Sequence, residues 1–269
     1  MGQNQRIMNK ELGRTIKLFL LWCLLYVATA IIGLILWRVF KNIEFFNWTI
    51  VLGYILIIIL FFGKGYVKLS FGRIEKPTIW PAVGVSVLIA VAQLFVLFSV
   101  LTLLDVDHLF PKNSESSSEV YEQLFLGIAG ILHACIIVPI VEEIGFRGIL
   151  LGGLLNSRCR PWLAIIISAI VFALFHMSPL KIASSILFGI ILGWLYWRTD
   201  SLILCIFIHV VNNSLCAVFS FIDLSIQPHS ICLITFSVSL FLLALGLWWF
   251  WKKFSYAKPY YYNYKTMKK

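Results

Sequence analysis

Charged residues are scarce in this sequence: they make up 13% of its 269 residues, whereas roughly a quarter is usual for a soluble domain. Hydrophobic residues make up 61%, and the mean hydropathy is +0.93. A soluble protein needs polar side chains over its surface, so this composition excludes a soluble globular domain. It indicates a chain whose surface mostly faces lipid.

Several motifs of soluble and metal-binding proteins are also absent. The six cysteines form no CxxC pair and mostly lie inside apolar runs, which favours small buried side chains over disulfides or metal ligands. The sequence has no HExxH segment and no internal repeat, and nothing in it marks a second domain or a soluble catalytic module.

The net charge of +10 comes from basic residues that lie between the apolar runs. This placement argues against a nucleic-acid partner and for contact with the lipid bilayer. One side of the predicted membrane protein receives 18 Lys and Arg residues and the other side receives 4. The positive-inside rule then predicts that both termini are cytoplasmic, and we expect a bacterial plasma membrane. The acidic loop 105–123 is expected outside, and the basic tail 252–269 is expected at the anionic inner leaflet.

The apolar runs predict an all-α, polytopic membrane protein with about eight transmembrane helices, because about 20 apolar residues cross a bilayer. The first run exceeds the ~7–15 residues of a signal peptide core and lacks a cleavage site, so we expect a retained helix. Trp22 and most other tryptophans lie near span ends, as in an interfacial aromatic belt. The predicted spans are 18–37, 45–63, 79–104, 122–141 (continuing toward 156), 162–177, 181–197, 201–221 and 230–251.

Polar and ionisable residues gather in the second half of the predicted membrane region. Such residues are costly in lipid, so each is a hypothesis for a functional site. A stable cluster without a function is the alternative, but so large a group of buried charges is poorly explained by stability alone. The cluster comprises Glu142, Glu143, Arg147, His176, His209, Asn212 and Asn213.

The spacing of these residues predicts how they meet. Glu143 and Arg147 are four residues apart on one helix, so they share a face and can form an ion pair. Glu142 lies about 100° around the helix from Glu143 and can face another partner. Counting residues from a turn near Cys159 places Glu142 and His176 at similar depth in an antiparallel helical hairpin. His209 also lies at membrane depth, so three helices bring polar groups together.

Three motifs occur in order along successive membrane segments. Residues 142–147 read EExxxR, residues 172–176 read FxxxH, and residues 209–213 read HxxxN. Together they resemble the CPBP family, the CAAX-protease and bacteriocin-processing group of intramembrane proteases, also called the Abi family. The resemblance covers about residues 120–221. The first three spans resemble the family only in being transmembrane segments.

The resemblance implies hydrolysis of a peptide bond in a membrane-associated peptide or protein substrate. By motif position, Glu142 is the expected general base and His176 helps to place the attacking water. His209 and Asn213 are expected to donate hydrogen bonds to the oxyanion, although the neighbouring Asn212 could compete with Asn213. Glu143 and Arg147 are expected to support this geometry. The chemistry is coherent, because a carboxylate removed from water is a stronger base and fixed donors stabilise a tetrahedral intermediate.

We expect five parts in the chain, of which the resemblance concerns the catalytic core. These are a basic N-terminus at 1–17, membrane spans within 18–121, a catalytic helical core at 122–221, a last span within 222–251 and a tyrosine-rich tail at 252–269.

Two questions stay open at this level. The favoured site contains no metal, but zinc is an alternative cofactor with His176, His209 and Glu142 as ligands. The favoured function is an intramembrane endopeptidase. The alternatives are a non-catalytic membrane scaffold, a bacteriocin-immunity protein and a proton-coupled transporter. The polar residues lie on consecutive helices rather than in two matching halves, which argues against an inverted-repeat transporter.

Overall fold

The computed structural model describes residues 3–104, 127–176, 179–220 and 229–254. Every regular element within these ranges is a helix, which confirms the predicted all-α class. The acidic loop 105–123 and the tail from residue 255 onward lie outside the described residues. The predictions made for those two segments are therefore not addressed by the structure.

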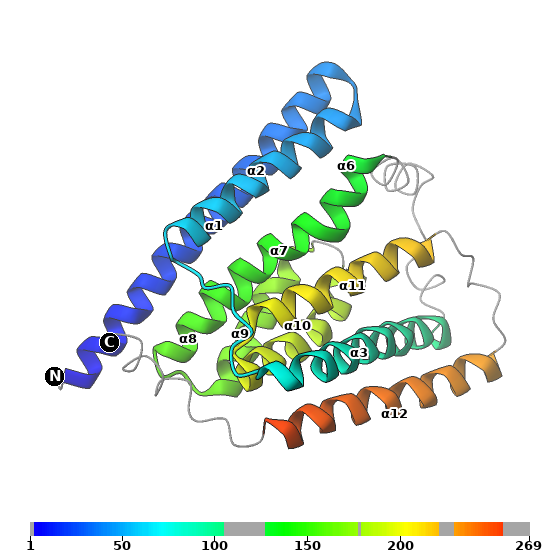
Figure 1. Ribbon diagram of the computed structural model, residues 1–269. Coiled ribbons are helices and arrows are strands. Elements are labelled where there is room, and N and C mark those ends of the chain that lie inside the picture. The colour runs from blue at the N-terminus through cyan, green and yellow to red at the C-terminus, as the bar shows by residue number, and fades with distance from the viewer. Residues whose placement is uncertain (1–2, 105–126, 177–178, 221–228, 255–269) are drawn as a thin grey trace.

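Helices α1 (Gln3–Phe40) and α2 (Ile43–Gly63) form an antiparallel hairpin along one side of the molecule (Figure 1). The hairpin turns at Lys41, which has a positive φ of 52°, and Asn42 caps α2 by accepting a hydrogen bond from the Glu44 N–H at 2.9 Å. Helix α1 begins at Gln3, so most of the basic segment predicted at 1–17 continues the first helix.

The fourth predicted span is one continuous helix from Ile128 to Asn156 with two π-helical stretches in it. Each π stretch uses wider i→i+5 hydrogen bonding, which changes the direction of the side chains and often occurs at functional sites. The α-helical turns between them carry both glutamates. In order, the segments are α6 (Ile128–Ile131), η1 (Leu132–Ile137), α7 (Val138–Glu143), η2 (Ile144–Leu151) and α8 (Gly152–Asn156).

Within the described ranges, seven helices are long and apolar enough to cross a membrane. Helix α9 has 14 residues, and at ~1.5 Å per residue it covers only about 21 Å of a hydrocarbon core that is ~30 Å thick. The expected count of about eight therefore corresponds to seven full spans and one shorter helix. The remaining helices are α3 (Lys76–Leu103), α9 (Pro161–Leu174), α10 (Pro179–Thr199), α11 (Leu202–Ser220) and α12 (His229–Lys253).

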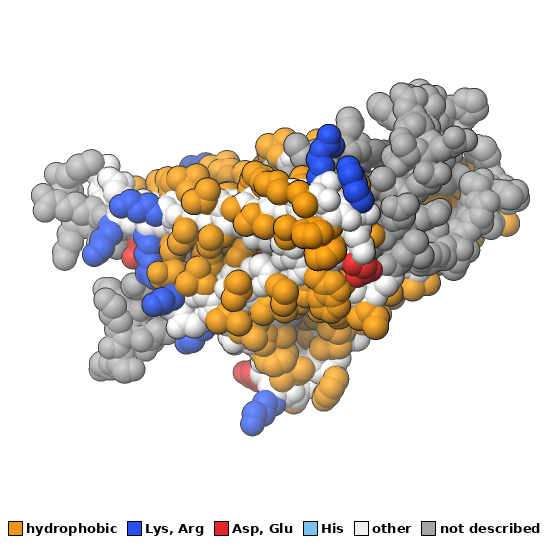
Figure 2. Space-filling model, turned by 90° about the horizontal axis from the view of Figure 1, so that it is seen from above, with side chains coloured by type: hydrophobic (Ala, Val, Ile, Leu, Met, Phe, Trp, Pro, Cys, Tyr) orange, Lys and Arg blue, Asp and Glu red, His pale blue; other side chains and the backbone are white. Residues whose placement is uncertain are grey.

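The helices pack in a broad bundle with the fourth span and α11 between two outer pairs (Figure 1). Helices α1 and α2 form one outer pair, and α3 and α12 lie side by side on the opposite face. Helices α9 and α10 form a second hairpin that packs on η2. Figure 2 shows that hydrophobic side chains cover most of the described surface in that view, with Lys and Arg toward its ends. This distribution fits a multi-pass membrane protein.

Helix α1 lies very close to the fourth span, and this contact positions the site described below. Trp22 is fully buried, and its ring fills the space that a Cβ atom on Gly145 would occupy. Its indole N–H donates a hydrogen bond to the Val141 carbonyl at 3.1 Å. Simple packing therefore explains Trp22, whereas Trp80, Trp162 and Trp248 are exposed.

Candidate active site

The predicted ion pair between Glu143 and Arg147 is present and entirely buried. Arg147 Nη1 lies 2.6 Å from Glu143 Oε1, and neither side chain is more than 1% exposed. The guanidinium also lies 4.7 Å from the centre of the Phe172 ring and donates a long hydrogen bond to the Gly189 carbonyl at 3.4 Å. Arg147 therefore ties together the fourth span, α9 and α10.

His209 on α11 joins this pair through the same carboxylate oxygen. Its Nδ1 lies 2.8 Å from Glu143 Oε1. An ionised carboxylate only accepts hydrogen bonds, so Nδ1 carries the proton in this arrangement. The other ring nitrogen, Nε2, faces Glu142 Oε2 at 3.7 Å, which is too long for a direct hydrogen bond. Phe172 and Phe188 contact the imidazole with their ring edges and fix its plane.

Glu142 has a partner that the sequence did not reveal. The hydroxyl of Tyr26 on α1 donates a hydrogen bond to Glu142 Oε1 at 3.1 Å. The Tyr26 ring in turn stacks on Tyr54 of α2, with 4.7 Å between the ring centres. The only sequence signal for this contact was a tyrosine in an apolar helix, 116 residues away from the glutamate. One glutamate oxygen is thus held by Tyr26 while the other faces His209.

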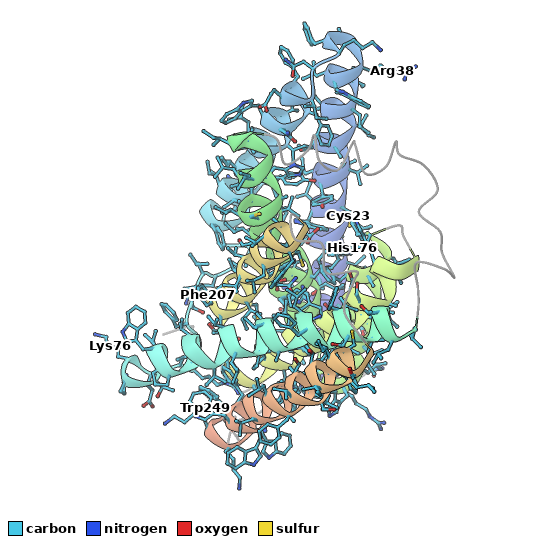
Figure 3. The ribbon with its side chains drawn as sticks, turned by 90° about the vertical axis from the view of Figure 1, so that its right-hand side faces the viewer. Cys23, Arg38, Lys76, His176, Phe207 and Trp249 are labelled. Atoms are coloured by element: carbon cyan, nitrogen blue, oxygen red, sulfur yellow. The ribbon has the colours of Figure 1, made fainter. Side chains whose placement is uncertain are left out.

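His176 lies just after α9 and is partly buried. Its Nδ1 contacts the Phe172 carbonyl at 3.2 Å. The Ser168 hydroxyl donates to the Phe146 carbonyl at 2.9 Å, and Phe172 lies against the Arg147 guanidinium, so α9 packs along the fourth span. The equal depth of Glu142 and His176 stays a prediction. Figure 3 shows His176 far from Arg38 at the end of α1.

Asn213 connects α11 to the first π stretch. Its amide nitrogen donates to the Ala134 carbonyl at 3.0 Å, in the stretch where π bonding alters the usual helical pairing. Asn212 donates weakly to the Asn213 side-chain oxygen at 3.4 Å. A side-chain amide carries two N–H groups. Asn213 therefore keeps one donor for another group after it has bonded to Ala134.

The two histidines and Asn213 line a common cavity of about 290 Å³, together with Asn212 and Phe172. Glu142 is not among the residues that line it. The structure thus joins Glu143, Arg147 and His209 by hydrogen bonds, with Glu142 Oε2 at 3.7 Å from His209 Nε2. It places His176 and Asn213 at the cavity beside them.

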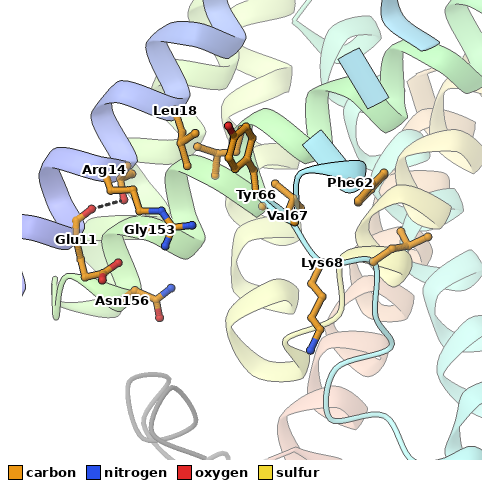
Figure 4. Close-up of a pocket in the computed structure, with 14 residues that line it drawn as sticks. Glu11, Arg14, Leu18, Phe62, Tyr66, Val67, Lys68, Gly153 and Asn156 are labelled. Atoms are coloured by element: carbon orange, nitrogen blue, oxygen red, sulfur yellow. Dashed lines mark hydrogen bonds between the residues drawn. The ribbon is translucent and has the colours of Figure 1, made fainter. Parts of the chain in front are cut away.

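A larger cavity of about 630 Å³ lies between α1, the segment after α2 and the end of the fourth span (Figure 4). Arg14, Lys68 and Asn156 contribute to its polar lining. Gly148 and Ile149 also line it, and they directly follow Arg147 in η2. None of the residues predicted for catalysis lies in this second cavity.

The alternative zinc site can be compared with this arrangement. Among the described residues, no three His, Cys, Asp or Glu side chains come together as a set that could hold a metal ion. Glu143 is held by Arg147 and His209 through the same oxygen. The choice between a metal-free site and a zinc ion on His176, His209 and Glu142 stays a prediction.

Comparison with known proteins agrees with the motifs. Residues 124–215 match the sequence profile of the family described as type II CAAX prenyl endopeptidase Rce1-like. The matched segment contains all three motifs and every residue predicted for the site, and Tyr26 lies outside it. Searches of curated proteins and of solved structures gave no significant match.

Proposed function

We propose that this chain, whose residues 124–215 match the sequence profile of the type II CAAX prenyl endopeptidase Rce1-like family, cleaves a peptide bond through a water molecule activated by Glu142. The substrate is a membrane-associated peptide or protein. The mechanism is supported by one observation above all. Glu142 Oε2 and His209 Nε2 face each other at 3.7 Å, while each side chain is held from behind by a separate partner.

The gap between these two atoms suits a bridging water. A water molecule can contact both a carboxylate oxygen and a ring nitrogen that are too far apart to bond directly. Glu142 is almost completely buried, and its carboxylate can accept a proton from this water. In the proposed first step, Glu142 takes a proton from this water, and the resulting hydroxide attacks the carbonyl carbon of the substrate.

The tetrahedral intermediate needs hydrogen-bond donors for its oxyanion. We assign this role to Nε2 of His209 and to the remaining N–H of the Asn213 amide. Glu143 accepts the Nδ1–H of His209 and holds the ring in this orientation. In the second step the carbon–nitrogen bond breaks, and the leaving amine takes the proton that Glu142 acquired.

The supporting residues hold this geometry without contacting the reacting atoms. Arg147 neutralises Glu143 and anchors it to α10 through Gly189. Tyr26 fixes the Glu142 carboxylate through Oε1, which leaves Oε2 directed at the water. Preorganisation of this kind is a large part of enzymatic rate enhancement.

The decisive experiment is peptidase activity of the purified full-length protein in detergent, with an internally quenched peptide substrate. We expect Glu142→Gln to lower the turnover rate by a factor on the order of 10² to 10⁴, because the amide cannot accept the proton. Glu75→Gln is the matched control, since Glu75 is exposed at the start of α3 and its side chain does not cap that helix. A folded Glu142→Gln protein with wild-type turnover would refute the proposal.

A further inference from the structure

Arg198, in the last turn of α10, is a buried cation that lacks an anionic partner. It is only 5% exposed, and no carboxylate forms an ion pair with it in the described part of the chain. Its Nη2 donates a long hydrogen bond to the Trp251 carbonyl at 3.5 Å, and its Nε has no partner. A buried guanidinium is costly unless its donors are satisfied, and the described residues supply no anion for it, which points to a bound anion.

Aromatic rings surround this guanidinium. Its central carbon lies 4.1 Å from the Trp251 ring centre, 5.4 Å from that of Trp197 and 5.7 Å from that of Trp194. Such rings hold a cation in place but do not satisfy its hydrogen-bond donors. The indoles therefore orient the guanidinium and leave its N–H groups to bind a planar or tetrahedral oxyanion.

More positive charge gathers at the same end of the molecule. The Arg73 N–H donates to the Thr199 carbonyl at 2.7 Å, so the backbone of Arg73 is bonded to the residue next to Arg198. Gly72, with a φ of +59°, permits this approach, because a Cβ atom there would collide with the Asp200 carbonyl. Lys252 and Lys253 end α12, which also carries Trp251. This local potential favours an anion.

An apolar groove of about 390 Å³ shares its wall with the Arg198 environment, because Trp194 and Trp251 belong to both. Helix α12 packs mainly along α3 and only slightly against α10. The groove lies between α12 and the α9–α10 hairpin. Trp162 and Trp248, on opposite sides of it, are 51% and 55% exposed. Besides the two shared tryptophans, the walls are formed by Trp162, Ile190, Ile191, Leu247 and Trp248.

We propose that Arg198 and this groove form a binding site for an anionic phospholipid, with the phosphate on the guanidinium and an acyl chain between α10 and α12. A soluble anion would satisfy Arg198 but would leave the apolar groove empty. A zwitterionic lipid would fill the groove, but its own cation would offset the phosphate charge. Basic pockets between membrane helices are known to recognise anionic headgroups in this manner.

The site is separate from the proposed catalytic group, since the groove and the histidine-lined cavity share no lining residue. The two are nevertheless connected through α10. Gly189 of this helix accepts the Arg147 hydrogen bond, and Phe188 packs against His209. A lipid that joins α10 to α12 therefore stabilises the helix that carries one wall of the site.

The test measures the thermal stability of the delipidated full-length protein in neutral detergent, with three separate additions. These are phosphatidylglycerol, phosphatidylcholine with the same acyl chains, and inorganic phosphate. We expect phosphatidylglycerol to raise Tm and native mass spectrometry to show it bound. Arg198→Gln should weaken its apparent affinity roughly ten-fold, as expected for the loss of a charged hydrogen bond. Arg38→Gln removes one exposed positive charge at the end of α1 and should leave the affinity unchanged.

A second pair of variants keeps the test decisive if Arg198→Gln fails to fold. Trp248→Ala removes one wall of the groove at a half-exposed position and should also weaken phosphatidylglycerol binding. Trp80→Ala, at a 78% exposed position away from the groove, should not. Equal stabilisation by phosphatidylcholine, or by inorganic phosphate, would overturn the proposal. Wild-type affinity in both Arg198→Gln and Trp248→Ala would overturn it as well.

Discussion

Replacing Arg147 with alanine leaves the Glu143 carboxylate buried without its main counter-charge. Both side chains are essentially inaccessible to solvent, and breaking a buried ion pair from one side costs about 3–5 kcal/mol. The substitution also removes the hydrogen bond to Gly189 and the contact with Phe172. We therefore expect Arg147→Ala to lower the free energy of unfolding by at least about 3 kcal/mol. Peptidase activity should also fall, because Glu143 is no longer held in place and cannot fix the position of His209.

The assay is unfolding in detergent followed by circular dichroism, together with folding yield and turnover. Arg38→Ala is the matched control at an exposed position, where a change within about 0.5 kcal/mol is expected. The double variant Glu143→Gln with Arg147→Met separates the cost of the unpaired Glu143 charge from the cost of the lost Arg147 packing. The glutamine oxygen still accepts from His209, so this protein should recover about 2 kcal/mol relative to Arg147→Ala. An Arg147→Ala protein with full stability and full activity would refute the reasoning.

Three further predictions follow from the site and the charge distribution. Tyr26→Phe removes the hydroxyl that positions Glu142, so it should lower turnover about ten-fold and shift the pH profile of kcat, whereas the exposed Tyr66→Phe should do neither. Strong chelators should leave the turnover of the purified protein unchanged. Loss of activity on chelation that zinc restores would instead assign His176, His209 and Glu142 as ligands. Reporter fusions after Tyr121 and at the C-terminus should report outside and cytoplasm respectively, and the reverse at either point would contradict the predicted topology.

The basic asymmetry behind that topology needs one adjustment. Arg147 was counted among the basic residues of a cytoplasmic loop, but it is fully buried and paired with Glu143. Without Arg147, the count is 17 basic residues on the predicted cytoplasmic side and 4 on the opposite side, so the predicted orientation is unchanged. The positive-inside rule concerns residues that meet the membrane surface, and a single sequence does not distinguish those from buried partners.

The sequence alone was sufficient for features that depend on local composition. Long apolar runs determine the helices and their approximate bounds, because backbone groups in lipid must be satisfied within the segment. The cost of charge in lipid singled out Glu142, Glu143, Arg147 and His209 as a set. The four-residue spacing also predicted the Glu143–Arg147 pair correctly.

Only the tertiary structure decided which residues from distant helices touch. The two π-helical stretches of the fourth span have no reliable signal in composition. Tyr26 reaches Glu142 because Trp22 packs on Gly145 and draws α1 against the fourth span. Contacts between helices in lipid arise from side-chain packing and hydrogen bonds rather than from hydropathy. Hydropathy therefore places each helix in the membrane, and packing alone determines its neighbours.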